Sequence, residues 1–254
     1  MKKIILGMFT LGFGLTADIH LPLDRTAHIL EQSQKEIGLF HPFVLGKNET
    51  TQYTMHPILE FVIPNVEVKK TIFPNRETNF AWALKLTYPT PLLKMVQKKG
   101  IGGMIADDPD FDPIPHIITA KMTLLNTRTI FKNHLMTFNG GLGLSVTNGT
   151  VDPRITIDLP WVYPRMNQYN NPISLNAGIH FTGPLWKNIG YDSGGEFTYT
   201  IGDGQNMSFE YGDYFFWQAT DRLKVYAGYD LYFAEYPFGS QWHLLPMIDL
   251  RYRW

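Results

Sequence analysis

The chain has 254 residues, with 22 lysines and arginines against 23 aspartates and glutamates, a formal net charge of -1, and no cysteine. The near-zero charge gives no electrostatic basis for binding nucleic acid, and the lack of cysteine excludes disulfides, cysteine-ligated metals and thiol nucleophiles. Hydrophobic residues make up 44% of the chain, too many for a disordered protein.

Residues 1–17 are predicted to be a secretory signal peptide. Lys2 and Lys3 precede an uncharged apolar run from Ile4 to Leu15, and Ala17 precedes a polar residue. This run is too short for a membrane-spanning helix, which needs about 20 residues. We therefore expect export, cleavage after Ala17, and one mature domain over residues 18–254.

In the first half of the mature chain, apolar and polar residues alternate in short segments, the pattern of β-strands. The pattern is weak at 36–46, 51–63 and 65–73, where Pro42 and Pro57 interrupt two of the three segments. It is clear at 80–88 and weak again at 116–126. Between these two, residues 91–100 predict a short helix that ends at Gly100.

The second half alternates more strongly. Strands are predicted at 136–146, 153–163, 173–181, 196–201, 207–211, 223–233 and 242–254, and the weakest of them, 153–163, contains Pro160. Asp213 falls on the apolar side of its segment, where we expect a bulge or a strand end.

These strands predict an all-β fold, a single transmembrane antiparallel β-barrel of about twelve strands, with ten to fourteen compatible with the pattern. The segments have about the 9–11 residues that a tilted membrane crossing needs, whereas soluble strands average about five or six. Aromatic residues also stand near the ends of the apolar faces, as at Trp242 and Trp254. The alternative is an exported soluble β-sandwich.

The last strand resembles that of bacterial outer-membrane β-barrel proteins, although no subfamily is identified. The resemblance rests on alternating apolar residues that end in an aromatic residue: Ile248, Leu250, Tyr252 and Trp254. It implies that these four residues are the signal read by the barrel-assembly machinery. It also implies location in the bacterial outer membrane, with the lipid of that membrane as a partner.

Both chain ends of such barrels normally lie in the periplasm. Counting back from Trp254 places the turns at Pro64–Asn65 and Gln218–Asp221 on that side. The count also places residues 89–115 there, although long loops usually face outward. The alternative is that the strand count before this segment is wrong by one.

The polar faces give the residues expected to line the lumen. Charges of both signs on neighbouring strands predict either an internal salt-bridge network or a charged constriction that selects small solutes. The predicted lining residues are Lys85, Lys121, Glu196, Glu210, Lys224, Asp230, His243, Asp249, Arg251 and Arg253.

No motif for catalysis, for a cofactor or for a metal is present. Ser240 and His243 are poorly spaced as a nucleophile and base, and a protease reading would have to recruit Asp192, Asp203 and His243.

The leading functional interpretation is therefore non-catalytic, a narrow pore or transport barrel for small solutes. One alternative is a closed structural barrel that binds partners through Ala234–Ser240 and Arg165–Pro172. The other is a lipid-modifying enzyme of the outer membrane.

Overall fold

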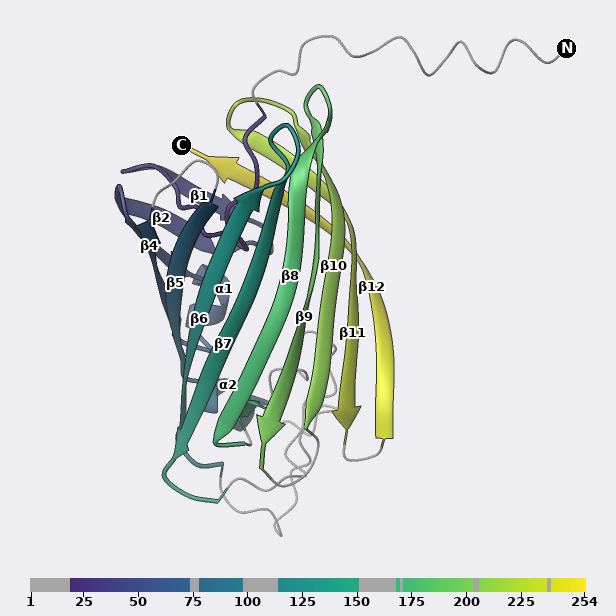
Figure 1. Cartoon of the computed structure of the whole chain (residues 1–254). Helices are drawn as coiled ribbons and strands as arrows, with labels where there is room; N and C mark the ends of the chain where they lie inside the picture. Colours follow the sequence, from purple (N-terminus) through teal and green to yellow (C-terminus); the bar gives the residue numbers. More distant parts are fainter. Residues whose placement is uncertain are drawn as a thin grey trace, which may run out of the picture.

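The structure, a computed structural model, describes residues 19–73, 78–97, 114–150, 168–169, 171–202, 206–236 and 239–254. Within these residues twelve strands form a closed antiparallel barrel, in which chain neighbours pair and β1 pairs with β12 (Figure 1). The predicted all-β barrel of about twelve antiparallel strands is confirmed. The predicted signal peptide, residues 1–17, lies outside the described residues.

The wall consists of twelve strands, of which the seven from β6 to β12 are the longest. The strands are β1 (Lys35–Gly38), β2 (Phe43–Asn48), β3 (Thr51–Met55), β4 (Asn65–Phe73), β5 (Thr78–Thr87), β6 (Ile117–Thr129), β7 (Leu135–Thr147), β8 (Ile173–Trp186), β9 (Ile189–Ile201), β10 (Met207–Gln218), β11 (Leu223–Tyr236) and β12 (Gly239–Arg253). Two short helices, α1 (Pro57–Glu60) and α2 (Thr90–Gln97), interrupt the series. Neither helix has the length and apolar composition to cross a membrane.

Proline divides the N-terminal strands differently from the sequence prediction. The strand expected at 36–46 is two strands, because Pro42 lies in the turn between β1 and β2. The strand expected at 51–63 ends at Met55, and Pro57 occupies the first turn of α1, where a missing N–H costs no hydrogen bond. Both corrections follow from the amide that proline lacks.

The strand predicted at 153–163 lies outside the described residues, and β7 pairs directly with β8. In an antiparallel barrel the chain changes ends with every strand. A count from the C-terminus that is wrong by one strand therefore places every earlier connection at the wrong end of the barrel. Pro64–Asn65 and the connection at 89–115 were predicted at the end that holds Trp254. This is wrong for Pro64–Asn65 and for the described ends of that connection, because β4 and β6 begin at the opposite end of the barrel. The turn at Gln218–Asp221 does lie at the C-terminal end.

The two faces of the wall differ in polarity, as β12 shows. Its even-numbered residues point outward and are apolar and exposed, with Trp242 60% and Ile248 65% accessible, whereas Asp249 on the inner face is only 4% accessible. Exposed apolar side chains continue around the other long strands. A continuous apolar surface of this kind is suited to hydrocarbon, in which a closed sheet leaves no unpaired edge.

The four residues of the predicted assembly signal lie on this outer face. The terminal residue also closes the barrel, because Trp254 and Lys35 exchange two backbone hydrogen bonds of 2.9 Å. The Lys35 ammonium lies 5.9 Å from the centre of a Trp254 ring. Recognition of these residues by an assembly machinery stays a prediction.

Asp213 does not end its strand. β10 continues from Met207 to Gln218 with no shift of register on either side. The prediction of a bulge or strand end at Asp213 is therefore wrong, and this carboxylate lies on the outer, apolar face.

Candidate functional site

The lumen is crossed by residues 19–31, which we call the N-terminal plug. The plug is the purple trace at the end of the barrel where the C-terminus also lies (Figure 1). The His20 amide donates to Gln218 Oε1 of β10 over 2.8 Å, and the Leu30 amide donates to Gln52 Oε1 of β3 over 3.0 Å. The plug thus connects strands that are far apart around the barrel.

The middle of the plug is held by side chains of β4 and β6. The Lys69 ammonium donates to the carbonyl oxygens of Leu23 and Thr26 over 2.8 and 3.1 Å. Thr71 donates to the Ala27 carbonyl over 3.0 Å, and the Ala27 amide donates to Thr127 Oγ1 over 2.7 Å. Lys69 is only 1% accessible, so plug carbonyls take the place of water around its charge.

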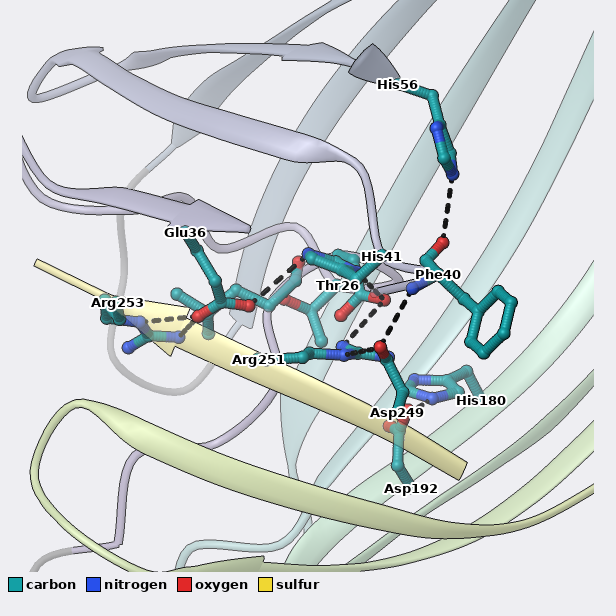
Figure 2. Close-up of polar contacts among 12 residues, drawn as sticks. Thr26, Glu36, Phe40, His41, His56, His180, Asp192, Asp249, Arg251 and Arg253 are labelled. Carbon is teal, nitrogen blue, oxygen red and sulfur yellow. Dashed lines mark hydrogen bonds and ion pairs between the residues drawn. The ribbon is translucent and has the colours of Figure 1, made fainter. Parts of the chain in front are cut away.

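A network of buried and partly buried charges joins the plug to β12 (Figure 2). Asp24 Oδ2 lies 3.5 Å from Arg251 Nη1, and Arg251 Nε donates to Asp249 Oδ2 over 3.0 Å. Asp249 Oδ1 accepts a hydrogen bond of 3.0 Å from the Phe40 amide, in the turn between β1 and β2. The Arg251 guanidinium carbon also lies 3.9 Å from the centre of the Tyr226 ring.

A second branch of the network closes the junction of β1 and β12. Arg253 donates to Glu36 Oε2 over 2.6 Å through Nε, with Nη2 equally close. His41 lies between two carboxylates, 3.4 Å from Glu36 Oε1 and 3.8 Å from Asp24 Oδ2. Loss of Asp24 would therefore disturb both branches.

A third contact lies on the wall formed by β8 and β9. His180 Nε2 is 2.7 Å from Asp192 Oδ1, and both side chains are 4% accessible (Figure 2). His180 Nδ1 is buried with no hydrogen-bond partner among the described residues.

Asp24 and His41, which lie outside the strands, have displaced pKa values. Burial alone would raise the pKa of the Asp24 carboxyl, but Arg251, His41 and Arg25 hold that pKa well below its ordinary value. Burial lowers the pKa of His41, and the Arg251 charge lowers it further, to about 4, although Asp24 and Glu36 oppose the change. At neutral pH, Asp24 is ionised and His41 is neutral.

The depressed pKa of His41 predicts a loss of stability in acid. A neutral imidazole is favoured in the folded state, so its contribution is complete above pH 6.5 and decreases as the pH falls towards about 4. The loss amounts to about 3 kcal/mol in the free energy of unfolding. When unfolding is monitored by heat-modifiable migration in gel electrophoresis, acid should destabilise His41→Gln less than it destabilises the parent chain. Equal acid destabilisation of both would contradict the assignment.

Towards the opposite end, the lumen wall carries a second polar group, the vestibule cluster, which consists of Lys121, Asn139, Asn176 and Glu196. Lys121 Nζ lies 2.5 Å from Glu196 Oε1. Asn139 and Asn176 donate to Glu196 Oε2 over 3.4 and 3.2 Å. The Lys121 and Glu196 side chains are 23% and 30% accessible, about as much as Asp24 of the plug network at 27%, whereas Arg251 is 12% accessible.

The structure divides the predicted lumen residues between these two levels. Lys121 and Glu196 belong to the vestibule cluster, with Lys85 paired in register to Lys121 and Glu210 to Glu196. Asp249, Arg251 and Arg253 belong to the plug network. The remaining three are Lys224, Asp230 and His243. Lys224 is buried, and its ammonium lies 5.6 Å from the centre of the Phe216 ring. Asp230 accepts a hydrogen bond of 3.2 Å from the Tyr232 hydroxyl, and His243 is in register with Tyr232.

The candidates for catalysis are not brought together. Ser240 and His243 are three residues apart on β12, so their side chains point to opposite faces of the wall. Asp192 is buried against His180, and Asp203 lies outside the described residues.

Sequence reasoning missed the plug and its partners on β1 and β4. Asp24, Glu36, His41 and Lys69 lie in segments whose alternation is weak or absent, so no periodic pattern assigned their side chains to the lumen. The adjacent opposite charges of Asp24 and Arg25, in a segment with no strand pattern, were the only available signal.

The sequence matches no protein-family model and no curated protein. Several solved structures are similar to the chain, among them three outer membrane proteins. A bacterial polysaccharide outer membrane secretin is 10% identical, with 87% of this chain and 69% of that chain covered and a TM-score of 0.47. OmpT of Vibrio cholerae, an outer membrane protein, in a form lacking loop L8, is 10% identical, with 86% and 62% covered and a TM-score of 0.44. The outer membrane channel DcaP of Acinetobacter baumannii is 7% identical, with 84% and 61% covered and a TM-score of 0.40. The chain spans less than two thirds of the length of the last two.

Proposed function

We propose that the chain is a transport barrel of the bacterial outer membrane that admits small polar solutes and is closed at rest by its N-terminal plug. In this proposal residues 1–17 direct export and are removed, and the end of the barrel that holds Trp254 faces the periplasm. The apolar outer face and the length of the strands from β6 to β12, 12 to 15 residues, support insertion into a membrane.

The observation that carries the proposal is the way in which the plug is held. From His20 to Leu30 its polar contacts with the wall are hydrogen bonds and ion pairs to side chains, and no described residue of this stretch pairs with a strand. One small apolar contact adds to them, in which Ala27 packs against Ala81, Ala83 and Leu125 of the wall. The twelve-strand ladder therefore does not depend on the plug. A segment held in this way can leave the lumen while the barrel stays closed on itself.

The vestibule cluster indicates the class of solute. Lys121 and Glu196 are partly accessible and form an ion pair. This level of the lumen therefore offers hydrogen-bond donors and acceptors without a strong excess of positive or negative charge. A twelve-strand barrel lies between the eight strands that side chains fill and the sixteen that leave a wide channel. We therefore propose small, hydrated, uncharged or zwitterionic solutes rather than large or strongly ionic ones.

Planar-bilayer recording tests this function. The full chain should be silent most of the time and show rare openings of small conductance, because the plug must leave before ions pass. Silence at every voltage, both in the full chain and in a folded chain without its plug, would contradict the proposal.

The second candidate is a closed barrel that binds partners through its loops. The plug network favours it, because Asp249 and Arg251, whose side chains are only 6% and 12% accessible, bind the plug to β12 through Asp24. Of the two predicted binding loops, Ala234–Ser240 and Arg165–Pro172, each lies partly outside the described residues. Removal of the plug separates the two functions if the wall side chains of a structural barrel close the lumen by themselves: that barrel then stays silent without its plug, whereas a transport barrel conducts.

A further inference from the structure

A cluster of polar side chains lies on the outer face of the barrel, across β9, β10 and β11. It consists of Ser193, Tyr211, Asp213 and Tyr229, and we call it the outer polar cluster. Asp213 is in register with Ser193 on one side and Tyr229 on the other. The Ser193 and Tyr211 hydroxyls are 2.9 Å apart, and the Tyr229 hydroxyl donates to Asp213 Oδ2 over 3.4 Å.

This cluster is surrounded by the apolar belt. On β10, Phe209 precedes it, and Phe215 and Trp217, which are 59% and 50% accessible, follow it towards the C-terminal end. On β11, Leu231 and Ala227 lie on either side of Tyr229. Asp213 is thus near the middle of a surface that faces hydrocarbon. Ionisable residues at such depth are costly and generally have a partner.

The cluster has hydrogen-bonding capacity that its own members do not use. Ser193 and Tyr211 share one hydrogen bond, so one of their two hydroxyl hydrogens is left over. Among the described residues, Asp213 accepts from Tyr229, and a carboxylate has room for several donors. Lipid tails at this depth offer neither donors nor acceptors, so only protein can complete the cluster.

A second copy of the chain has the required complement at the required depth. Rotation about an axis along the membrane normal leaves depth unchanged, so a donor and an acceptor at one level of the barrel meet each other across a two-fold axis. The small side chains of Ser193 and Ala227 let two walls approach closely at this point.

We propose that the outer face of β9 to β11 is the interface of a homodimer in the membrane. In each direction, the Ser193–Tyr211 hydroxyl pair of one copy donates to Asp213 of the other. Two such contacts, related by symmetry, give the spare hydroxyl hydrogen and the Asp213 carboxylate of each copy a hydrogen-bond partner and shield them from hydrocarbon.

Cysteine cross-linking tests the interface, because the chain contains no cysteine. Ala227→Cys is placed at the interface, and Leu84→Cys, on the outer face of β5, is the matched control. With a short bis-maleimide added to native membranes, Ala227→Cys should give a cross-linked dimer and Leu84→Cys should not. Adding Asp213→Leu to Ala227→Cys should reduce the dimer roughly tenfold, whereas Asp213→Asn, which keeps an acceptor, should retain more of it.

Heat-modifiable migration shows whether each variant has kept its barrel. The proposal is overturned if folded Ala227→Cys gives no dimer, if Asp213→Leu leaves the yield unchanged, or if the product has the mass of the chain joined to a different protein. This experiment measures association alone, so its outcome is independent of the proposed transport function.

Discussion

A chain that lacks residues 19–31 should form a stable barrel that conducts ions continuously, whereas the full chain stays closed. The deletion removes every contact from His20 to Leu30 and leaves β1 and its pairing with β12 intact. Water then reaches Lys69, Asp249 and Arg251, whose charges are at present covered by the plug. Recording in planar bilayers should show long openings in place of rare ones.

A point substitution provides the graded form of the same result. Asp24→Asn weakens the contacts with Arg251 and His41, and the open probability should rise about tenfold, which corresponds to about 1.4 kcal/mol. Glu31→Gln is the control within the plug, because the Glu31 side chain is exposed and, among the described residues, its carboxylate bonds only the neighbouring Gln34. A deletion variant that folds but stays silent would favour the closed structural barrel.

Arginine should be far more damaging on the outer face of β12 than on the inner face. Ile248→Arg places a charge in the apolar belt and should lower the free energy of unfolding in lipid by about 2–4 kcal/mol. Met247→Arg, one residue away and at nearly the same depth, points into the lumen and should cost less than about half of that.

Reversible urea unfolding in phospholipid vesicles measures both variants against the parent chain. Because the two positions are adjacent, differences in depth and in strand pairing are nearly eliminated. A larger loss for Met247→Arg than for Ile248→Arg would mean that the assignment of the two faces is inverted.

The long C-terminal strands could be predicted because each of their faces meets a different medium. From Leu223 to Phe233 and from Trp242 to Trp254 the outer positions are apolar and most inner ones are polar, which gives the sequence a period of two. The inward direction of Asp249 and Arg251 follows from the same alternation. Their partners did not, because Asp24 is more than two hundred residues away in the chain and lies in a segment without a pattern.

The errors in the prediction also have physical causes. Pro42 splits one expected strand into β1 and β2, and β7 pairs directly with β8, so the described barrel still has twelve strands while the intervening connections lie at other ends than expected. Asp213 was misread because a carboxylate on an apolar face normally ends a strand. In this barrel it is retained beside the Tyr229 hydroxyl.

The most direct test of the account is a spin-label scan along β12, with single cysteines introduced one at a time from residue 243 to residue 250 in this cysteine-free chain. In lipid vesicles, labels at even positions should collide mainly with oxygen dissolved in the bilayer, and labels at odd positions mainly with a water-soluble nickel complex. A signal that alternates with a period of two is the predicted result, with oxygen access greatest at outward positions such as Ile248 and nickel access greatest at inward positions beyond the plug network, such as His243. Equal access of the nickel complex to both sets would show that the apolar face is not in lipid and would contradict the membrane barrel.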